Sequence, residues 1–383
     1  MSEFKPEQIK LLTDFRRKLH QFPLVSGEES KTIDKIIEYL SGRVDTKMTR
    51  IVDGKGLICE FDSGHEGPSI LVRADVDALP IQESSKKSYQ SIHKGKAHSC
   101  GHDGHTTILC GVAERLHENP ILKGKVILLF QPSEEIGEGS QMVLDDSYFA
   151  ELKIDQVIAL HNIPGVELGH VLWKSGVMCA ASTGVIVSIK GETGHAAYPE
   201  LGNSPIETVN QLISVFNELP KQINGPGFGL RVTIAGINAG GPNFGVSPSD
   251  ALLWLTLRTL DQKVLDEACN KVESVVTDIC EKAGQQYKIE FTEYFEVTKN
   301  DESLITDFKE VISAMNLPNE ELTEPFNWSE DFGRFTSKYP GFLFGLGSGL
   351  DCKPLHHSAY DFPDDLIPHG IRIFENYLRT QLQ

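Results

Sequence analysis

Short, uninterrupted apolar runs separated by helix-like patterns dominate the first part of the chain. The clearest run, residues 126–130, follows a helical pattern at 106–117, and apolar residues at helical spacing also mark residues 6–20. Strands buried on both faces of a parallel sheet read as continuous apolar runs. We therefore predict an α/β fold with a mostly parallel sheet. The predicted strands cover residues 56–61, 69–74, 125–130 and 156–160.

Two further patterns predict where helices begin in this region. Ser26 is a residue type that caps helices, and it predicts a helix that runs to about Leu40. The helix at 106–117 is predicted to begin just after a segment rich in cysteine and histidine. Ligands of parallel sheets gather at the carboxyl ends of the strands, so this segment is expected to lie near a site.

A different order of elements follows between residues 183 and 295. The pattern predicts the order β-α-β-β-α-β, with elements at 184–190, 204–219, 231–237, 251–259, 262–283 and 287–295. This order is typical of a ferredoxin-like α+β domain, which forms its own sheet without flanking sequence. We therefore predict an inserted domain at 183–295, flanked by the two parts of a catalytic domain at 1–182 and 296–383. The second part is predicted to contain a helix at 302–315, a strand at 342–345 and a helix at 365–382.

Composition narrows the class of partner. The 383 residues carry a formal net charge of −18, which argues against nucleic acid or an anionic membrane as a ligand. The seven cysteines are scattered and include no Cys-x-x-Cys pair, so neither a disulfide framework nor a zinc ribbon is indicated. No signal peptide precedes the first helical pattern, and no apolar run is long enough to span a bilayer. We expect a cytoplasmic protein that acts on a small molecule.

Side chains that bind borderline divalent metals recur where the predicted strands end. The segment Cys-Gly-His-Asp-Gly-His begins at Cys100, two adjacent carboxylates follow the most apolar strand, and single or paired histidines follow two later segments. The candidates are Cys100, His102, Glu134, Glu135, His161, His356 and His357. This pattern predicts a two-metal hydrolytic site.

The adjacent carboxylates at 134 and 135 suit metal-assisted hydrolysis. In extended backbone they point to opposite sides, so that one binds metal while the other takes a proton from the attacking water. Taken singly, each feature also has a plain explanation: a solvated acidic turn, a buried cysteine, or a structural histidine. The glycine-rich segment at 345–349 matches neither a dinucleotide loop nor a nucleophile elbow, which disfavours those two classes of protein.

Several motifs in the same order resemble the M20 family of metallopeptidases and amidohydrolases. The likeness is to its aminoacylase-like branch, which includes hippurate hydrolases and indoleacetyl-amino-acid hydrolases, and it extends over nearly the whole chain. The matching segments are residues 17–20, 73–80, 100–106, 131–135, 160–162, 194–197, 257–259, 355–356 and 360–362.

The resemblance implies a role for each matching residue. Two divalent ions, of manganese, zinc, nickel or cobalt, are expected to be bound by Cys100, His102, Glu135, His161 and His356, with Glu134 as general base. Arg73 stands where other branches have a histidine ligand, and His357 is expected to be a bystander. Residues expected to orient the ligands are Asp75, Asp77, Asp103 and His105.

The inserted domain resembles the lid and dimerisation module of the family. The likeness implies a homodimer in which His195, often from the partner subunit, stabilises the oxyanion. By itself His195 reads as a surface loop histidine. Gly245 replaces the usual substrate-contacting asparagine, for which Asn243 is a possible substitute. Arg258 is expected to pair with a substrate carboxylate, although an arginine that ends a strand is commonly a surface residue.

The sequence thus predicts a metal-dependent amidohydrolase that cleaves N-acyl amino acids or related small amides. Two alternatives stay open: an exopeptidase or dipeptidase of the same family, and a metal-binding homologue without turnover.

Overall fold

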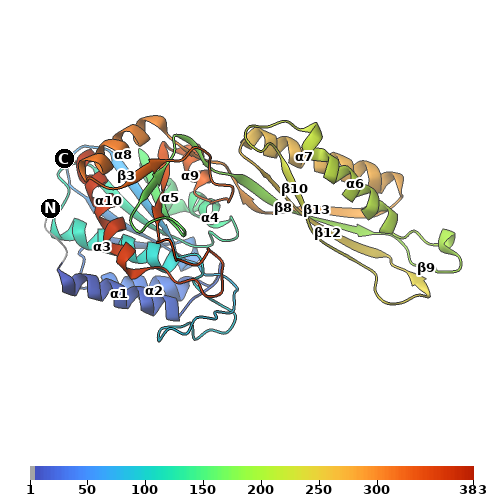
Figure 1. Cartoon of the computed structure of the whole chain (residues 1–383), viewed down its shortest axis with the longest axis horizontal. Helices are drawn as coiled ribbons and strands as arrows, with labels where there is room; N and C mark the ends of the chain where they lie inside the picture. Colours follow the sequence, from blue (N-terminus) through green and yellow to red (C-terminus); the bar gives the residue numbers. More distant parts are fainter. Residues whose placement is uncertain (1–4) are drawn as a thin grey trace. The chain divides into compact units, whose positions relative to one another are not determined.

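A computed structural model describes residues 5–383, and it divides into two compact units (Figure 1). Of the described residues, the first unit contains 5–178, 298–324 and 331–383, and the second contains 179–297 together with 325–330. The sequence predicts an inserted domain at 183–295. The second unit begins slightly before and ends slightly after these boundaries, and it also includes the later segment 325–330. Residues 1–4, the start of the stretch in which no signal peptide is predicted, lie outside the described residues.

The first unit is built on an eight-stranded mixed sheet with the order β1-β2-β4-β3-β5-β16-β6-β15. Its strands are β1 (Lys47–Ile51), β2 (Gly56–Asp62), β3 (Ser69–Asp75), β4 (Lys125–Gln131), β5 (Gln156–Ile163), β6 (Val171–Trp173), β15 (Asn319–Glu321) and β16 (Gly341–Gly347). The four central strands, in the spatial order β4, β3, β5 and β16, run parallel to one another. The mostly parallel sheet that the sequence predicts is therefore confirmed at its centre, and antiparallel pairing is confined to the flanks.

Helices cover both faces of this sheet, which explains why its central strands are apolar on both sides. The first hydrophobic core joins the sheet to α1 (Pro6–Gln21), α2 (Ser30–Leu40), α3 (His102–Glu118), α8 (Glu302–Ala314) and α10 (Ile367–Gln381). Shorter helices complete the unit: α4 (Gly139–Asp145), α5 (Ser147–Ala150) and α9 (Gly333–Lys338).

Two helix starts differ from the sequence-based prediction. Helix α2 begins at Ser30, and the Ser26 hydroxyl does not cap it but donates to Asp77 at 2.7 Å. Helix α3 begins at His102 instead of Thr106, because Gly101 takes the left-handed conformation (φ 103°) that lets the chain turn directly into the helix. Part of the Cys/His segment is therefore helical.

The second unit is a four-stranded antiparallel sheet with two helices on one face (Figure 1). Its sheet order is β10-β12-β8-β13, formed by β8 (Ala181–Lys190), β10 (Arg231–Ala239), β12 (Asp250–Thr259) and β13 (Gln286–Phe295). The helices are α6 (Ile206–Gln222) and α7 (Gln262–Lys282), whose apolar faces share one core with alternate strand residues. The predicted β-α-β-β-α-β order is observed.

Short elements fill the remaining connections. The additional strands are β7 (Gly176–Cys179), β9 (Gly194–His195), β11 (Val246–Ser247) and β14 (Thr298–Asn300). Short 3-10 turns occupy Val52–Gly54, Pro199–Leu201 and Asp364–Leu366. Among residues 5–383, no helix combines the length and apolarity needed to cross a membrane.

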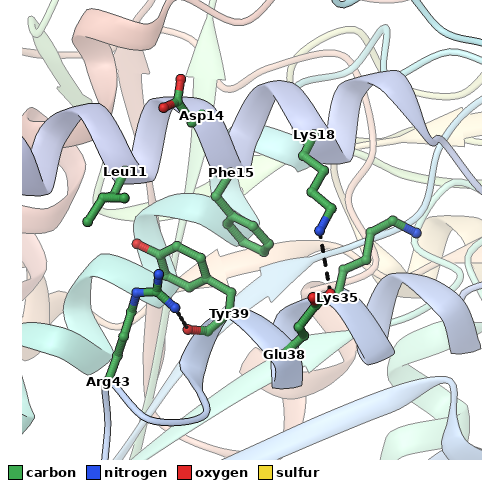
Figure 2. Close-up of a pocket in the computed structure, with 8 residues that line it drawn as sticks. All are labelled: Leu11, Asp14, Phe15, Lys18, Lys35, Glu38, Tyr39 and Arg43. Carbon is green, nitrogen blue, oxygen red and sulfur yellow. Dashed lines mark hydrogen bonds and ion pairs between the residues drawn. The ribbon is translucent and has the colours of Figure 1, made fainter.

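A shallow surface cavity of about 240 Å³ lies between α1 and α2 (Figure 2). The rings of Phe15 and Tyr39 stack there with centroids 4.2 Å apart, and Lys18 pairs with Glu38 at 3.4 Å. The cavity is lined by Leu11, Asp14, Phe15, Lys18, Lys35, Glu38, Tyr39 and Arg43. None of these side chains belongs to the predicted metal site.

Candidate metal centre

The parallel strands bring side chains from distant parts of the sequence to one edge of the sheet. Glu134 and Glu135 lie in the turn after β4, His161 lies near the end of β5, and His356 lies in the segment after β16. His102 is the first residue of α3, and Cys100 precedes it. The carboxyl ends of parallel strands meet at the same edge, so these segments converge.

Among the described residues, five groups of three side chains have potential ligand atoms within 4.8 Å of one another, and two of these groups share Cys100. The first is Cys100, His102 and His161, and the second is Cys100, Glu135 and His356. The Cys100 sulfur lies 3.6 Å from His161 Nε2, and Glu135 Oε2 lies 3.5 Å from His356 Nε2. All five predicted ligands are thus brought together, and the thiol of Cys100 is common to both groups.

Hydrogen bonds fix which nitrogen each buried imidazole presents. His102 Nδ1 donates to the backbone carbonyl of Asp77 at 3.0 Å, and His161 Nδ1 donates to that of Asn162 at 2.9 Å. Because a carbonyl oxygen can only accept, Nδ1 carries a proton in both rings, and Nε2 is the nitrogen that offers a lone pair when the ring is neutral. His102 Nε2 and Glu135 Oε1 are buried and have no hydrogen-bond partner among the described residues. Such unpaired buried atoms are costly, and a bound cation would satisfy them.

The two adjacent carboxylates do not lie in extended backbone, so the reason given for their opposite orientation was wrong. Residues 134–137 form a tight turn closed by the Gly137 N–H to Glu134 carbonyl bond at 2.8 Å. Glu134 Oε2 and Glu135 Oε1 lie 4.0 Å and 3.7 Å from the same atom, His102 Nε2. Both carboxylates therefore face the same volume, and the turn places them side by side.

The electrostatics of the centre favour a cation. Burial alone would lower the pKa of His102, but the carboxylates of Asp75, Asp77 and Glu135 raise it to about 10. Burial raises the pKa of Glu135, and neighbouring Asp77 and Asp75 add to this effect. The cluster thus concentrates negative charge in a buried volume, where a divalent ion would relieve the repulsion.

Of the four residues expected to orient the ligands, Asp75 and Asp77 contact His102 directly. Asp75 Oδ2 lies 3.6 Å from His102 Nε2, and its other oxygen pairs with His105 Nδ1 at 2.6 Å. His105 Nε2 in turn lies 2.5 Å from Asn162 Oδ1. Asp103 instead faces away, in a buried group with His20 at 2.9 Å and Arg16 at 3.3 Å. His357 accepts from the backbone N–H of Ala359 at 3.0 Å.

Arg73 is held in buried ion pairs. Its guanidinium donates to Asp75 Oδ2 and to Asp331 Oδ1, both at 2.8 Å. The backbone N–H of Asp331 donates to Glu134 Oε1 at 3.3 Å.

Sequence reasoning assigned no role to Asn162, Asp331 or Tyr360. The Tyr360 hydroxyl accepts from the Asn162 side chain at 2.5 Å. Asn162 and Tyr360 were marked only by their place within two of the segments that match the family.

The second unit carries the three other predicted site residues. His195 in β9 pairs with Val246 in β11, and the Ala196 N–H donates to the Gly245 carbonyl at 3.0 Å. The Asn243 side chain accepts from the Gly245 N–H at 3.2 Å. The His195 loop and the Asn243 loop are thus joined within this unit.

Arg258 lies at the other end of the same sheet. It donates to the Asn327 carbonyl and to the Ser329 hydroxyl, both at 2.8 Å. The His195 loop extends from the end of the sheet where Asp250 pairs with Lys190. At about 3.4 Å per residue, the strand from Asp250 to Arg258 spans roughly 27 Å. Within one chain, His195 and Arg258 therefore lie too far apart for one small substrate to contact both.

Comparisons with known proteins agree with this architecture. A family model described as peptidase family M20/M25/M40 matches residues 71–380. The N-acetyl-L-cysteine deacetylase of Bacillus subtilis is 33% identical over 360 residues, which cover 94% of this chain and 85% of the relative. The N-acetyldiaminopimelate deacetylase of Bacillus licheniformis is 27% identical over 374 residues, which cover 97% and 98% of the two chains.

A solved structure supports the same relationship. The crystal structure of a Bacillus subtilis protein described as a dinuclear metal-binding peptidase from the M20 family is similar with a TM-score of 0.81. The two proteins are 26% identical, and the match covers 99% of each chain. The similarity therefore extends over both units.

Proposed function

Because the chain belongs to peptidase family M20/M25/M40, we propose that it is a metal-dependent amidohydrolase that releases the acyl group from N-acyl amino acids. The observation that carries this proposal is the pair of three-residue groups that share Cys100, with the Glu134 carboxylate beside them. Two relatives that align with most of the chain are named as deacetylases of N-acetylated amino acids. The substrate class proposed here follows those names and the chemistry of the centre.

The proposed centre holds two divalent ions. Cys100, His102 and His161 would hold one ion, and Cys100, Glu135 and His356 the other. The buried atoms His102 Nε2 and Glu135 Oε1, which have no hydrogen-bond partner among the described residues, support this assignment. Thiolate, imidazole and carboxylate donors suit zinc, manganese, nickel or cobalt. When bound, such ions polarise a carbonyl and make water a better nucleophile at neutral pH.

Glu134 is proposed as the general base. Its carboxylate lies 4.0 Å from His102 Nε2, and the Asp331 N–H holds one of its oxygens. It would take a proton from the attacking water and deliver it to the nitrogen of the leaving amine as the amide bond breaks. The products are a free carboxylic acid and a free amino acid.

A substrate panel tests the proposed function. Purified protein, incubated separately with Mn²⁺, Zn²⁺, Co²⁺ and Ni²⁺, is expected to hydrolyse N-acetyl amino acids and to lose this activity with a chelator. N-benzoyl amino acids and dipeptides in the same assay measure the acyl preference. Hydrolysis of dipeptides alone would reassign the chain to the peptidases, and inactivity on every amide would contradict the proposal.

A homodimer is proposed to complete each active site. His195 is proposed to stabilise the oxyanion, with Asn243 beside it, and Arg258 is proposed to bind the substrate carboxylate. The span of roughly 27 Å between the two ends of β12 supports a role for two subunits at each site. In this arrangement, His195 of one subunit serves the metal centre of its partner.

Subunit mixing tests this arrangement. Glu134→Ala and His195→Ala are each expected to be nearly inactive, and dissociating and reassociating an equal mixture should restore activity. Half of the random dimers contain one subunit of each kind, and each such dimer has one complete site of two, so recovery should reach about a quarter of wild-type activity. If His195 instead served the site of its own subunit, no dimer of this mixture would have a complete site. Reassociated dimers without recovered activity would place His195 in the site of its own subunit.

The proposed location is the cytoplasm. All seven cysteines are free thiols in the described structure, and the proposed ligand Cys100 must remain reduced to bind metal. A reducing compartment keeps such thiols available.

A further inference from the structure

The segment Ser26–Glu29, predicted only to begin a helix, packs against the turn that carries Glu134 and Glu135. The side chain of Glu29 is fully buried. Its Oε1 accepts from the Ser133 N–H and from the Ser133 hydroxyl, both at 2.9 Å, and from the Gly27 N–H at 2.8 Å. Three donors therefore converge on one carboxylate oxygen.

Ser133 has a strained backbone. Its φ of 55° lies in the left-handed region, which residues other than glycine seldom adopt. Such conformations persist where the surrounding structure holds them in place. Both donors of Ser133, its N–H and its hydroxyl, are bonded to Glu29. Because Ser133 directly precedes Glu134, its conformation sets the direction in which the turn leaves β4.

A second contact joins the same segment to the centre. The Ser26 hydroxyl donates to Asp77 Oδ2 at 2.7 Å, and the Glu135 N–H donates to the same oxygen at 3.1 Å. The Asp77 carbonyl accepts from His102 at 3.0 Å. Residues 26–29 therefore hold the turn at two points, one before Glu134 and one at Glu135.

We propose that Glu29 is a positioning residue that holds Ser133 in its left-handed conformation and thereby fixes the carboxylates of Glu134 and Glu135 at the metal centre. This proposal rests on the proposed function for its catalytic consequence. The geometry it describes also governs metal binding, because Glu135 is a proposed ligand. Glu29 acts through Ser133 and does not itself touch the reacting atoms.

Four variants separate positioning from a general loss of structure. Glu29→Ala removes the acceptor, whereas Glu29→Gln keeps an acceptor oxygen at the same place. Ser133→Gly adopts a positive φ without strain, and Ser133→Ala removes the hydroxyl but keeps the strain. Glu28→Ala, a change to an exposed neighbour of the same type, is the matched control.

Glu29→Ala is expected to lower kcat by roughly 100-fold with little change in KM, since a small misplacement of a catalytic group costs about this much. Glu29→Gln should stay within about threefold of the wild type, because it keeps the acceptor. The double variant Glu29→Ala with Ser133→Gly should recover to within about threefold of Ser133→Gly alone, because glycine no longer needs the restraint. Glu29→Ala with Ser133→Ala should remain as impaired as Glu29→Ala.

Metal affinity provides a readout that does not depend on turnover. Titration of metal-free protein with Mn²⁺ against a chromogenic chelator should show affinity about 10-fold weaker in Glu29→Ala and restored by Ser133→Gly. Unchanged affinity and turnover in Glu29→Ala, or a loss that Ser133→Gly does not restore, would overturn the proposal. If the wild type hydrolyses no amide, the proposed function fails, while the metal titration still decides the role of Glu29.

Discussion

Replacing Glu134 by alanine is expected to lower kcat for an N-acetyl amino acid by about 100- to 10,000-fold while both metal ions stay bound. The proposed ligands lie on other side chains, so the metal sites survive the change. What is lost is the group that accepts the proton from water and delivers it to the leaving nitrogen, and such general base catalysis contributes about this factor. Steady-state kinetics and metal analysis of the same sample measure both quantities.

Glu138→Ala is the matched control for that result. Glu138 lies in the same segment, is exposed, and makes no side-chain capping bond at the start of α4. Its removal should leave kcat within about twofold of the wild type, as for most surface substitutions. If Glu134→Ala kept full turnover, or lost activity only because it lost metal, Glu134 would not be the general base.

Replacing His356 by alanine should release one ion of the two and abolish most turnover. His356 Nε2 lies 3.5 Å from Glu135 Oε2, and its side chain is 53% exposed, so the change removes a ligand without opening the core. Loss of an orienting partner already costs roughly 10- to 100-fold in metal affinity, and loss of a ligand should cost at least that much. Metal content after gel filtration should fall from two ions per subunit to one.

The neighbouring His357 gives this experiment its control. His357 has the same chemistry but is bonded to the backbone of Ala359 and belongs to neither ligand group. His357→Ala should retain two ions and near wild-type kcat. Equal metal loss in both variants would show that the segment as a whole, and not the His356 imidazole, holds the ion.

The sequence was sufficient to predict which side chains converge. His161 lies near the end of a parallel strand, Glu135 and His356 follow such strands, and Cys100 and His102 lie at the start of α3. Parallel strands end at a common edge, which brings these side chains together. The order of elements in the second unit could also be predicted, because apolar residues alternate in strands such as β8 and recur at helical spacing in α7. Local periodicity carries this kind of information.

Features that depend on distant contacts could not be predicted from local pattern. The turn at Glu134 and Glu135 follows from the positive φ of Ser133, which is bonded to Glu29, a residue 104 positions away. The early start of α3 depends on the left-handed Gly101. The flanking strand β1 has no continuous apolar run and is defined by its pairing with β2. At Ser133 and in β1, tertiary contacts decide the conformation.

Anomalous X-ray diffraction from crystals of the zinc-loaded protein tests the central claim most directly. The account predicts two zinc peaks per subunit near the Cys100 sulfur, one beside His102 and His161 and the other beside Glu135 and His356. A single peak, or peaks that avoid the Cys100 sulfur, would contradict a two-metal centre that shares this thiolate.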